Sequence, residues 1–232
     1  MDLAQRVQDV SNVAETIAHT MEELIYAAEL RPGQYLRQES LDKEFGVSRV
    51  PVRDALHLLE RRGLAVTIPR KGVMVRPLTP EEVRDLYGLR KALEPYAARE
   101  AASRITPNET AKLAGIIDTQ RRAQAQGDMK TFMSADEDFH RELCALAGNK
   151  ALNEVIADVW VRIKQVRSVA RADTSWGEQW ATRSVQRHER ILATVSSGNG
   201  KAAVRITEEV IRQSSEELMR AMAEFGWTSD AE

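Results

Sequence analysis

The stretch from Glu39 to Leu56 reads ESLDKEFGVSRVPVRDAL. It predicts two short helices joined by a tight turn, because Gly46 suits the left-handed backbone that such a turn needs. Ser48 is placed to cap the second helix, and Pro51 lies in its first turn, where a missing N–H costs little. Apolar residues recur along the second helix at helical spacing and predict its buried face: Val52, Ala55, Leu56 and Leu59.

Arg49 and Arg53 lie four residues apart and share the outward side of this second helix. Hydroxyl and basic side chains at the start of a second helix suit the reading of a DNA major groove. Downstream, residues 64–68 and 73–76 alternate as two strands around a basic hairpin tip, Pro69-Arg70-Lys71-Gly72. The segment is therefore predicted to be a winged helix–turn–helix that binds DNA.

The distribution of charge agrees with this prediction better than the net charge does. The whole chain carries a formal charge of −2, which argues against a non-specific polyanion binder. Residues 30–76, however, hold ten Lys or Arg against five Asp or Glu, whereas residues 1–29 hold one against six. The positive surplus lies where the motif places a nucleic-acid face, which favours docking by a folded module.

The spacing of these motifs resembles the DNA-binding domain of GntR-type bacterial transcription regulators over about residues 12–76. The resemblance rests on Pro32-Gly33, on the run from Gly46 to Leu56, on Gly63-Leu64 and on Lys71-Gly72-Val73. It implies that Arg49 and Arg53 contact the operator and that Gly72 approaches the minor groove. For Arg37, a solvated surface position is an equal alternative. The residues expected at the DNA interface are Arg37, Ser48, Arg49, Pro51, Arg53, Arg70, Lys71 and Gly72.

Length and composition indicate two globular domains. The chain has 232 residues, of which 43% are hydrophobic, enough for two cores. Its single cysteine, Cys144, excludes a disulfide framework within the chain and suits a reducing cytoplasm. The sequence shows neither a membrane-spanning run nor a signal-peptide layout, so we expect a cytoplasmic protein without membrane partners.

Pro77-Leu78-Thr79-Pro80 marks the expected boundary, because two prolines within four residues interrupt both strand and helix. We expect a DNA-binding domain with a helical lead-in at 1–76, a linker at 77–80, an all-helical ligand-binding and dimerisation domain at 81–224, and a tail at 225–232. The fold class is therefore mostly α, with the winged domain followed by an antiparallel six-helix bundle. The helices are predicted at about 80–104, 107–126, 129–147, 150–170, 177–197 and 199–224.

Several polar residues of the predicted bundle lie on apolar stripes. Asp136 and His140 are four apart on the inward face of the helix from 129, and His188 is on that of the helix from 177. Arg90 lies among apolar residues of the first bundle helix. A lone carboxylate is costly in such surroundings, so polar groups that point into one bundle interior indicate a ligand cavity.

Two interpretations of this cluster remain open from the residues alone. Asp136, His140 and His188 have the chemistry of a site for Zn²⁺, Ni²⁺ or Mn²⁺. Alternatively, Asp136 orients His140 within a hydrogen-bonded network that holds no metal. Arg90 likewise either offers paired donors to an effector carboxylate or forms an internal ion pair with Glu94.

The bundle resembles the effector domain of the FadR subgroup of GntR regulators, an FCD-type domain, over about residues 80–222. The resemblance rests on Asp136-Glu137-Asp138-Phe139-His140, Gly148-Asn149 and the run from His188 to Leu192. It implies that Arg90, Asp136, His140 and His188 bind the effector, because metal-binding members use an Asp and three His to hold a metal beside a carboxylate. This chain departs from the pattern, since Val210 takes the third histidine slot and Glu209 lies about 100° round the helix.

The sequence therefore predicts a transcription regulator and not an enzyme. We expect a repressor that binds a palindromic operator as a homodimer and responds to a small organic acid. One alternative is a metal-dependent enzyme that uses Asp136, His140 and His188, but the chain lacks a His-Glu-x-x-His motif or a nucleophile–base signature. The other is a DNA-architectural protein without a sensing function, against which the inward polar residues argue.

Overall fold

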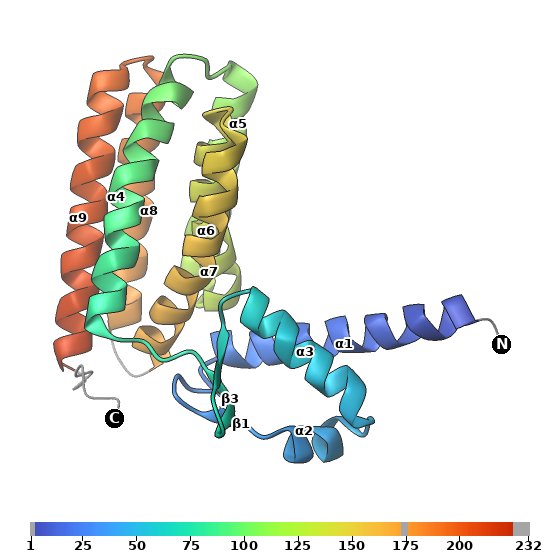
Figure 1. The fold of residues 1–232 in the computed structure, drawn as a ribbon. Coiled ribbons are helices and arrows are strands. Elements are labelled where there is room, and N and C mark those ends of the chain that lie inside the picture. Colours follow the sequence, from blue (N-terminus) through green and yellow to red (C-terminus); the bar gives the residue numbers. More distant parts are fainter. Residues whose placement is uncertain (1–2, 173–175, 225–232) are drawn as a thin grey trace. The chain divides into compact units, whose positions relative to one another are not determined.

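The structure is a computed structural model that describes residues 3–172 and 176–224, so the expected tail at 225–232 lies outside the described residues. Nine helices and three strands occur in those ranges. The chain divides into two compact units, the first ending at Thr79 and the second beginning at Pro80 (Figure 1).

The N-terminal unit contains a helix–turn–helix built from α2 (Gln38–Phe45) and α3 (Arg49–Arg61), and α3 packs against α1 (Leu3–Tyr26). Gly46 ends α2 in the left-handed conformation, with φ 65°, and its N–H donates to the Asp42 carbonyl. The predicted inward face of α3 is buried in full, as Val52, Ala55, Leu56 and Leu59. The predicted helix–turn–helix is thus confirmed.

A three-stranded antiparallel sheet forms the wing, in the order β1 (Tyr35–Leu36), β3 (Gly72–Val75), β2 (Ala65–Ile68). The register pairs Val66 with Met74 and Ile68 with Gly72, as a hairpin requires. The hairpin was predicted, but β1 was not. Its two residues are extended because they pair with Met74 and Val73, a contact between segments far apart in the chain.

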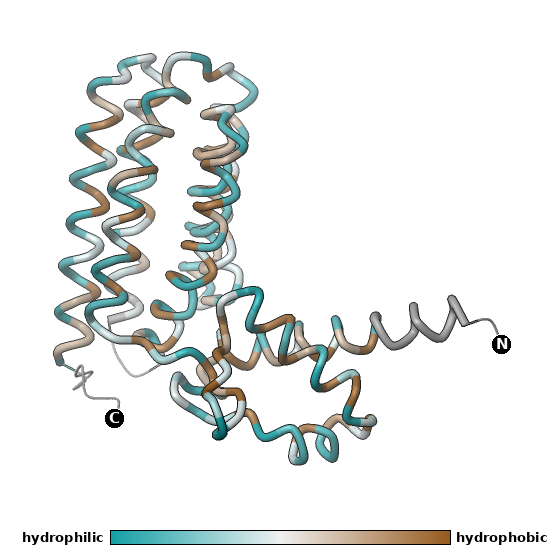
Figure 2. Tube along the Cα trace, in the orientation of Figure 1, coloured by the Kyte–Doolittle hydropathy of each residue, from teal (hydrophilic) through white to brown (hydrophobic). Residues whose placement is uncertain are grey.

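The second unit is a bundle of antiparallel helices (Figure 1). Apolar residues recur along each of them, as Figure 2 shows. Thr106 and Glu109 form a capping box that fixes the start of one helix. The close neighbours in the bundle include α4 with α9, α5 with α6 and α8, and α8 with α9. The helices are α4 (Pro80–Ala102), α5 (Pro107–Gln126), α6 (Met129–Leu146), α7 (Lys150–Ala172), α8 (Trp176–Ser196) and α9 (Gly200–Glu224).

The bundle core is mainly apolar, with Phe132, Phe139, Leu143, Trp180 and Ile191 among its fully buried members. Buried polar and charged side chains occur on every one of its helices. Among the described residues, no helix has the length and apolar character needed to cross a membrane.

Candidate functional site

The recognition helix α3 exposes the two arginines that the sequence selects. The side chains of Arg49 and Arg53 are 75% and 59% exposed. Arg49 lies 3.8 Å from Glu39 and 3.7 Å from Asp42, both on α2, and these contacts orient it without removing it from solvent. A shallow cleft of about 360 Å³ adjoins Arg49 and is also lined by Arg37, which is exposed.

The tip of the wing presents a second basic group. Arg70 has φ 66° and Gly72 has φ 102°, so the hairpin turns through two left-handed residues. Arg70, Lys71 and Gly72 are all exposed at this tip. A cationic loop with a residue lacking a side chain can approach a phosphate backbone closely.

Two expectations at the start of α3 need correction. Pro51 is buried, together with the adjacent Val52, because it is on the side of the first turn that faces the core. We therefore remove Pro51 from the predicted DNA interface. Ser48 occupies the N-cap position with extended backbone, but its side chain makes no capping hydrogen bond. Its hydroxyl is exposed.

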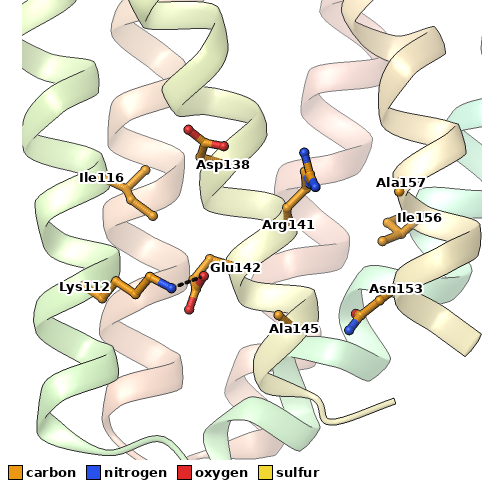
Figure 3. Close-up of a pocket in the computed structure, with 9 residues that line it drawn as sticks. All are labelled: Lys112, Ile116, Asp138, Arg141, Glu142, Ala145, Asn153, Ile156 and Ala157. Atoms are coloured by element: carbon orange, nitrogen blue, oxygen red, sulfur yellow. Dashed lines mark hydrogen bonds and ion pairs between the residues drawn. The ribbon is translucent and has the colours of Figure 1, made fainter. Parts of the chain in front are cut away.

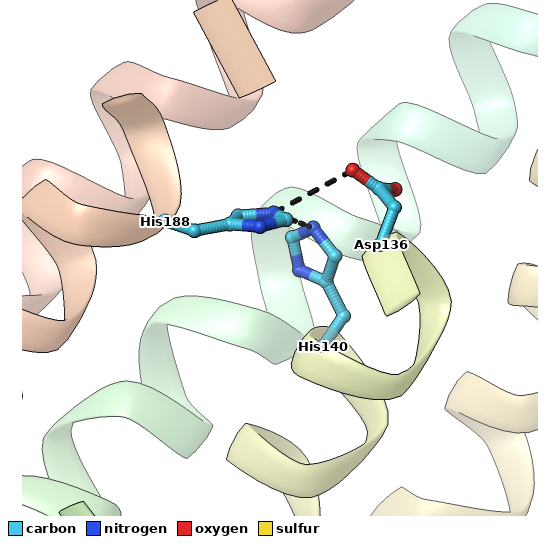
Figure 4. Close-up of side chains that lie close together, drawn as sticks. All are labelled: Asp136, His140 and His188. Atoms are coloured by element: carbon cyan, nitrogen blue, oxygen red, sulfur yellow. Dashed lines mark hydrogen bonds and ion pairs between the residues drawn. The ribbon is translucent and has the colours of Figure 1, made fainter. Parts of the chain in front are cut away.

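In the bundle, Asp136, His140 and His188 come together in one buried cluster, although they belong to two helices, α6 and α8 (Figure 4). Each is only 2% exposed. The Nε2 atoms of the two histidines are 3.1 Å apart, and His188 Nε2 is 3.7 Å from Asp136 Oδ1. One ligand atom from each residue lies within 4.8 Å of the other two.

The Asp136 carboxylate is surrounded by donors. Arg167 of α7 donates to Oδ2, while Ser184 and Gln120 donate to Oδ1 over 2.5 and 3.1 Å. Burial alone would raise the pKa of Asp136, but the Arg167 guanidinium holds this pKa well below its usual range. Asp136 is therefore an anion that accepts hydrogen bonds on both oxygens.

This anion also determines the proton position on His188. Because Gln120 must turn its amide N–H toward Asp136, its carbonyl oxygen faces His188 Nδ1, 2.8 Å away. Nδ1 of His188 is therefore protonated and donates to Gln120. Burial lowers the pKa of His188 well below 6.5 despite the nearby carboxylate, so the ring is neutral and its Nε2 carries a lone pair.

His140 has no tautomer that satisfies both of its nitrogen contacts. Its Nδ1 lies 2.9 Å from Glu94 Oε2, at an angle poor for a hydrogen bond, and its Nε2 faces the lone pair of His188. Burial lowers the pKa of His140 below 6.5, although Glu94 opposes the shift. With the proton on Nδ1, two Nε2 lone pairs meet at 3.1 Å; with the proton on Nε2, a lone pair meets a carboxylate.

A divalent cation fits this arrangement. Metal–nitrogen distances of about 2.0–2.1 Å allow two Nε2 atoms at this spacing to bind one ion, and both Nδ1 atoms then face acceptors, as in many metal sites. Asp136 would supply the oxygen ligand. Val210, in the slot of the third histidine, is buried and offers no ligand, while Glu209 is turned away and pairs with Arg190 at 3.0 Å.

Arg90 forms the internal ion pair that the sequence gives as one of its two roles. Its Nε donates to Glu94 Oε1 over 2.6 Å, and both side chains are buried. Its guanidinium also lies 4.3 Å from the ring of Trp160, which stacks on His140 at 4.3 Å. Arg90 is thus joined to the histidine pair through Glu94 and Trp160.

Several members of this network were not identified from the sequence: Gln120, Arg167, Ser184 and Ser214. The same signal that identifies Asp136, a polar residue on an apolar stripe, applies to Arg167, which follows Trp160 and Ile163 by seven and four positions. On α7 that signal is weak, because apolar residues are buried on most sides of this helix.

A separate cleft of about 560 Å³ lies on the solvent-facing side of α6, between α5 and α7 (Figure 3). Its charged lining is already paired in part, since Lys112 contacts Glu142 at 2.6 Å. The residues that line it differ from those of the buried cluster: Lys112, Ile116, Asp138, Arg141, Glu142, Ala145, Asn153, Ile156 and Ala157. The cleft is therefore distinct from the candidate ligand site.

Comparison with known families places the chain among GntR-type transcription regulators. The family described as bacterial regulatory proteins, gntR family, matches residues 13–75, and the FCD domain matches residues 85–213, more than half of the chain. The chain belongs to this family of DNA-binding transcription regulators, which are not enzymes.

Two curated relatives illustrate the similarity. The transcriptional repressor RspR of Escherichia coli K12 is 27% identical over 202 residues, 87% of each chain. The Nta operon transcriptional regulator of Aminobacter aminovorans is 34% identical over 139 residues, which cover 59% of this chain and 65% of the relative.

Solved structures share the fold. A GntR transcriptional regulator from Rhodococcus sp. RHA1 superposes with a TM-score of 0.75 at 22% identity, over 90% of this chain and 98% of that one. Escherichia coli McbR/YncC gives a TM-score of 0.74 at 20% identity, over 90% and 97% of the two chains.

Proposed function

We propose that this regulator is a repressor that leaves its operator when a small carboxylate binds in the bundle. The observation that carries the proposal is the pairing of an exposed basic winged domain with a buried, charged polar cluster in a second domain. The similarity to RspR, which is named a repressor, supports the sign of regulation. The DNA-facing residues of the proposal are Arg37, Ser48, Arg49, Arg53, Arg70, Lys71 and Gly72.

The sensing site of the proposal comprises Arg90, Asp136, His140 and His188. When Zn²⁺, Ni²⁺ or Mn²⁺ is bound, Asp136, His140 and His188 hold it, and the ion supplies a positive centre for the effector carboxylate. Glu94 and Gln120 orient the two imidazoles, and Trp160 packs against one of them. The buried charges of this site distinguish it from the core of a purely architectural domain.

Repression follows from linkage between the two domains. An effector that binds one arrangement of the protein better than the other shifts the population toward it, by no more than its difference in affinity. We propose that the operator-binding arrangement is the one disfavoured by the effector. Because a single winged module contacts little DNA, two copies of the chain would bind a palindromic operator together.

The test separates DNA binding from sensing. An operator is first selected from random DNA, and acetate, lactate, malonate, succinate and citrate are then screened with and without Ni²⁺ for release of the protein. His140→Ala should bind the operator like wild type but lose the response, because the two sites are in different domains. Asp138→Ala, an exposed neighbour on α6, is the matched control and should respond normally. A normal response from His140→Ala would move the sensing site elsewhere.

A further inference from the structure

Arg167 occupies the position that a cation would take beside Asp136. Its guanidinium is 3% exposed, donates to Asp136 Oδ2 and reaches Ser214 Oγ at 3.4 Å. It lies 5.0 Å from the ring centres of both Trp160 and Trp180, so aromatic faces enclose it. Its Nε is buried and has no hydrogen-bond partner among the described residues.

The charged groups around the histidine pair cancel one another in the metal-free protein. Arg90 neutralises Glu94, and Arg167 neutralises Asp136, while the histidines are uncharged. A divalent cation added to this interior leaves two positive charges uncompensated. Buried charge without a partner is strongly unfavourable, so the cation alone should bind weakly.

We propose that a divalent cation and Arg167 exchange places on Asp136, so that the cation and a dianionic carboxylate effector bind as a pair. This inference rests on the proposed function and specifies how the sensing site is loaded. The cation takes over the neutralisation of Asp136, and the Arg167 guanidinium, no longer paired, becomes a receptor for the effector.

Two unused donors support the effector half of the exchange. Arg90 Nη1, like Arg167 Nε, is buried without a hydrogen-bond partner among the described residues. Both guanidiniums lie within 5.0 Å of the ring centre of Trp160. Guanidinium N–H groups are strong donors to carboxylates, so an effector near Trp160 would satisfy groups that the metal-free protein leaves unmet.

The charge balance also selects the class of effector. A cation with two charges and an effector with two negative charges restore the neutrality of the interior, whereas a monocarboxylate leaves one charge uncompensated. The effector is therefore expected to be a small dicarboxylate in preference to a monocarboxylate. The size of the preference depends on how far the interior is shielded from water.

Titration calorimetry with Ni²⁺ tests the coupling on the full chain, with malonate as the dianion and acetate as the monoanion. Free nickel is corrected for its complexes with either anion in solution. Malonate should tighten nickel binding by about tenfold or more, a typical coupling between two ligands, and acetate should tighten it less. An unchanged nickel affinity in malonate, or an equal effect of acetate, would overturn the exchange.

Arg167→Gln gives an opposite and more specific expectation. Without its guanidinium Asp136 is free, so nickel alone should bind more tightly than to wild type, by about tenfold, and malonate should lose its effect. Nickel should also raise the melting temperature of this variant more than that of wild type, which provides a readout if the metal-free variant is unstable. Nickel binding that is unchanged or weaker in Arg167→Gln contradicts the proposal.

Two further variants separate charge from folding. Arg167→Lys retains the positive charge and should keep part of the malonate effect. Arg187→Gln removes another buried arginine, one that pairs with Glu217 on α9, and should leave the coupling intact. If malonate releases the operator without affecting nickel affinity, the exchange is wrong and the proposed function stands; if malonate tightens nickel but never affects operator binding, the reverse holds.

Discussion

Asp136, His140 and His188 lie in an interior where neighbouring side chains, not water, decide which groups carry protons. Asp136 stays ionised because Arg167, Ser184 and Gln120 replace the hydrogen bonds that water would make. The histidines stay neutral because the charged imidazolium would lose its hydration. The cluster thus combines one anion and two neutral bases, the protonation states that a divalent cation requires of its ligands.

These protonation states predict how the stability of the metal-free protein depends on pH. Because the pKa values of His140 and His188 are lowered on folding, the unfolded chain binds more protons below pH 6.5, its usual histidine pKa. Stability should therefore be full above that pH and fall as the solution is acidified. Between pH 7.5 and 5.5 the two residues together should cost about 1–3 kcal/mol of unfolding free energy.

Urea unfolding of chelator-treated protein at pH 7.5 and 5.5 measures this difference. The double variant His140→Gln, His188→Gln is the control, and its stability should vary less with pH than that of wild type. Asp136 and Glu94 do not interfere, because their pKa values are also lowered and their contribution is lost only at much lower pH. Equal pH dependence in the two proteins would show that the histidines are not held neutral by the fold.

At this scale the sequence identifies single side chains better than their connections. Asp136, His140, His188 and Arg90 were each predicted to point inward, and all four are buried. That Arg167 reaches Asp136 was not predictable, because the contact joins α6 and α7 across the bundle and depends on how these helices pack. A stripe pattern shows which face is buried but not which residue lies opposite.

At the scale of the element, α3 combines a core face with a DNA-facing side. Val52, Ala55, Leu56 and Leu59 fix the helix against its unit, so the arginines on the other side have a defined position. The net surplus of positive charge in residues 30–76 surrounds this helix. A rigid element with exposed cations at its start has the form that groove reading requires.

Replacing Arg49 or Arg53 with Ala should each weaken operator binding by about 1–3 kcal/mol, because each would lose contacts to base edges or phosphates. Neither change should affect folding much, since both side chains are largely exposed and surface ion pairs contribute little. Gel-shift titration at fixed salt measures the effect. Arg61→Ala, at the exposed far end of α3, is the matched control. Wild-type binding by both single variants would refute the assignment of α3.

The predictability of elements depends on whether their signals are local. Helices α5 and α6 begin and end within a residue of expectation, because prolines and glycines mark their limits: Pro107, Gly127 and Gly148. Strand β1 was missed, since its two residues become a strand only by pairing with β3. Pro51 was assigned to the wrong environment because its position in the first turn of α3 does not reveal which side faces the core.

At the scale of the whole molecule, the two units divide the work that the proposal describes. The cluster of buried charges lies entirely within the unit that begins at Pro80, and the exposed basic residues lie within the unit that ends at Thr79. A mutation in one cluster can therefore change effector response without changing the surface that meets DNA. Coupling between them has to pass through the arrangement of units or of two copies of the chain.

Assembly of two copies is the last prediction. A single winged module meets too little DNA for tight specific binding, so the chain should pair, and we place this pairing in the bundle. Light scattering should give a mass of twice 26.1 kDa for the full chain, and a fragment of residues 78–232 should also be dimeric. The fragment of residues 1–76 should be monomeric and bind the operator far more weakly. A monomeric 78–232 fragment beside a dimeric full chain would place the contact in the winged domain instead.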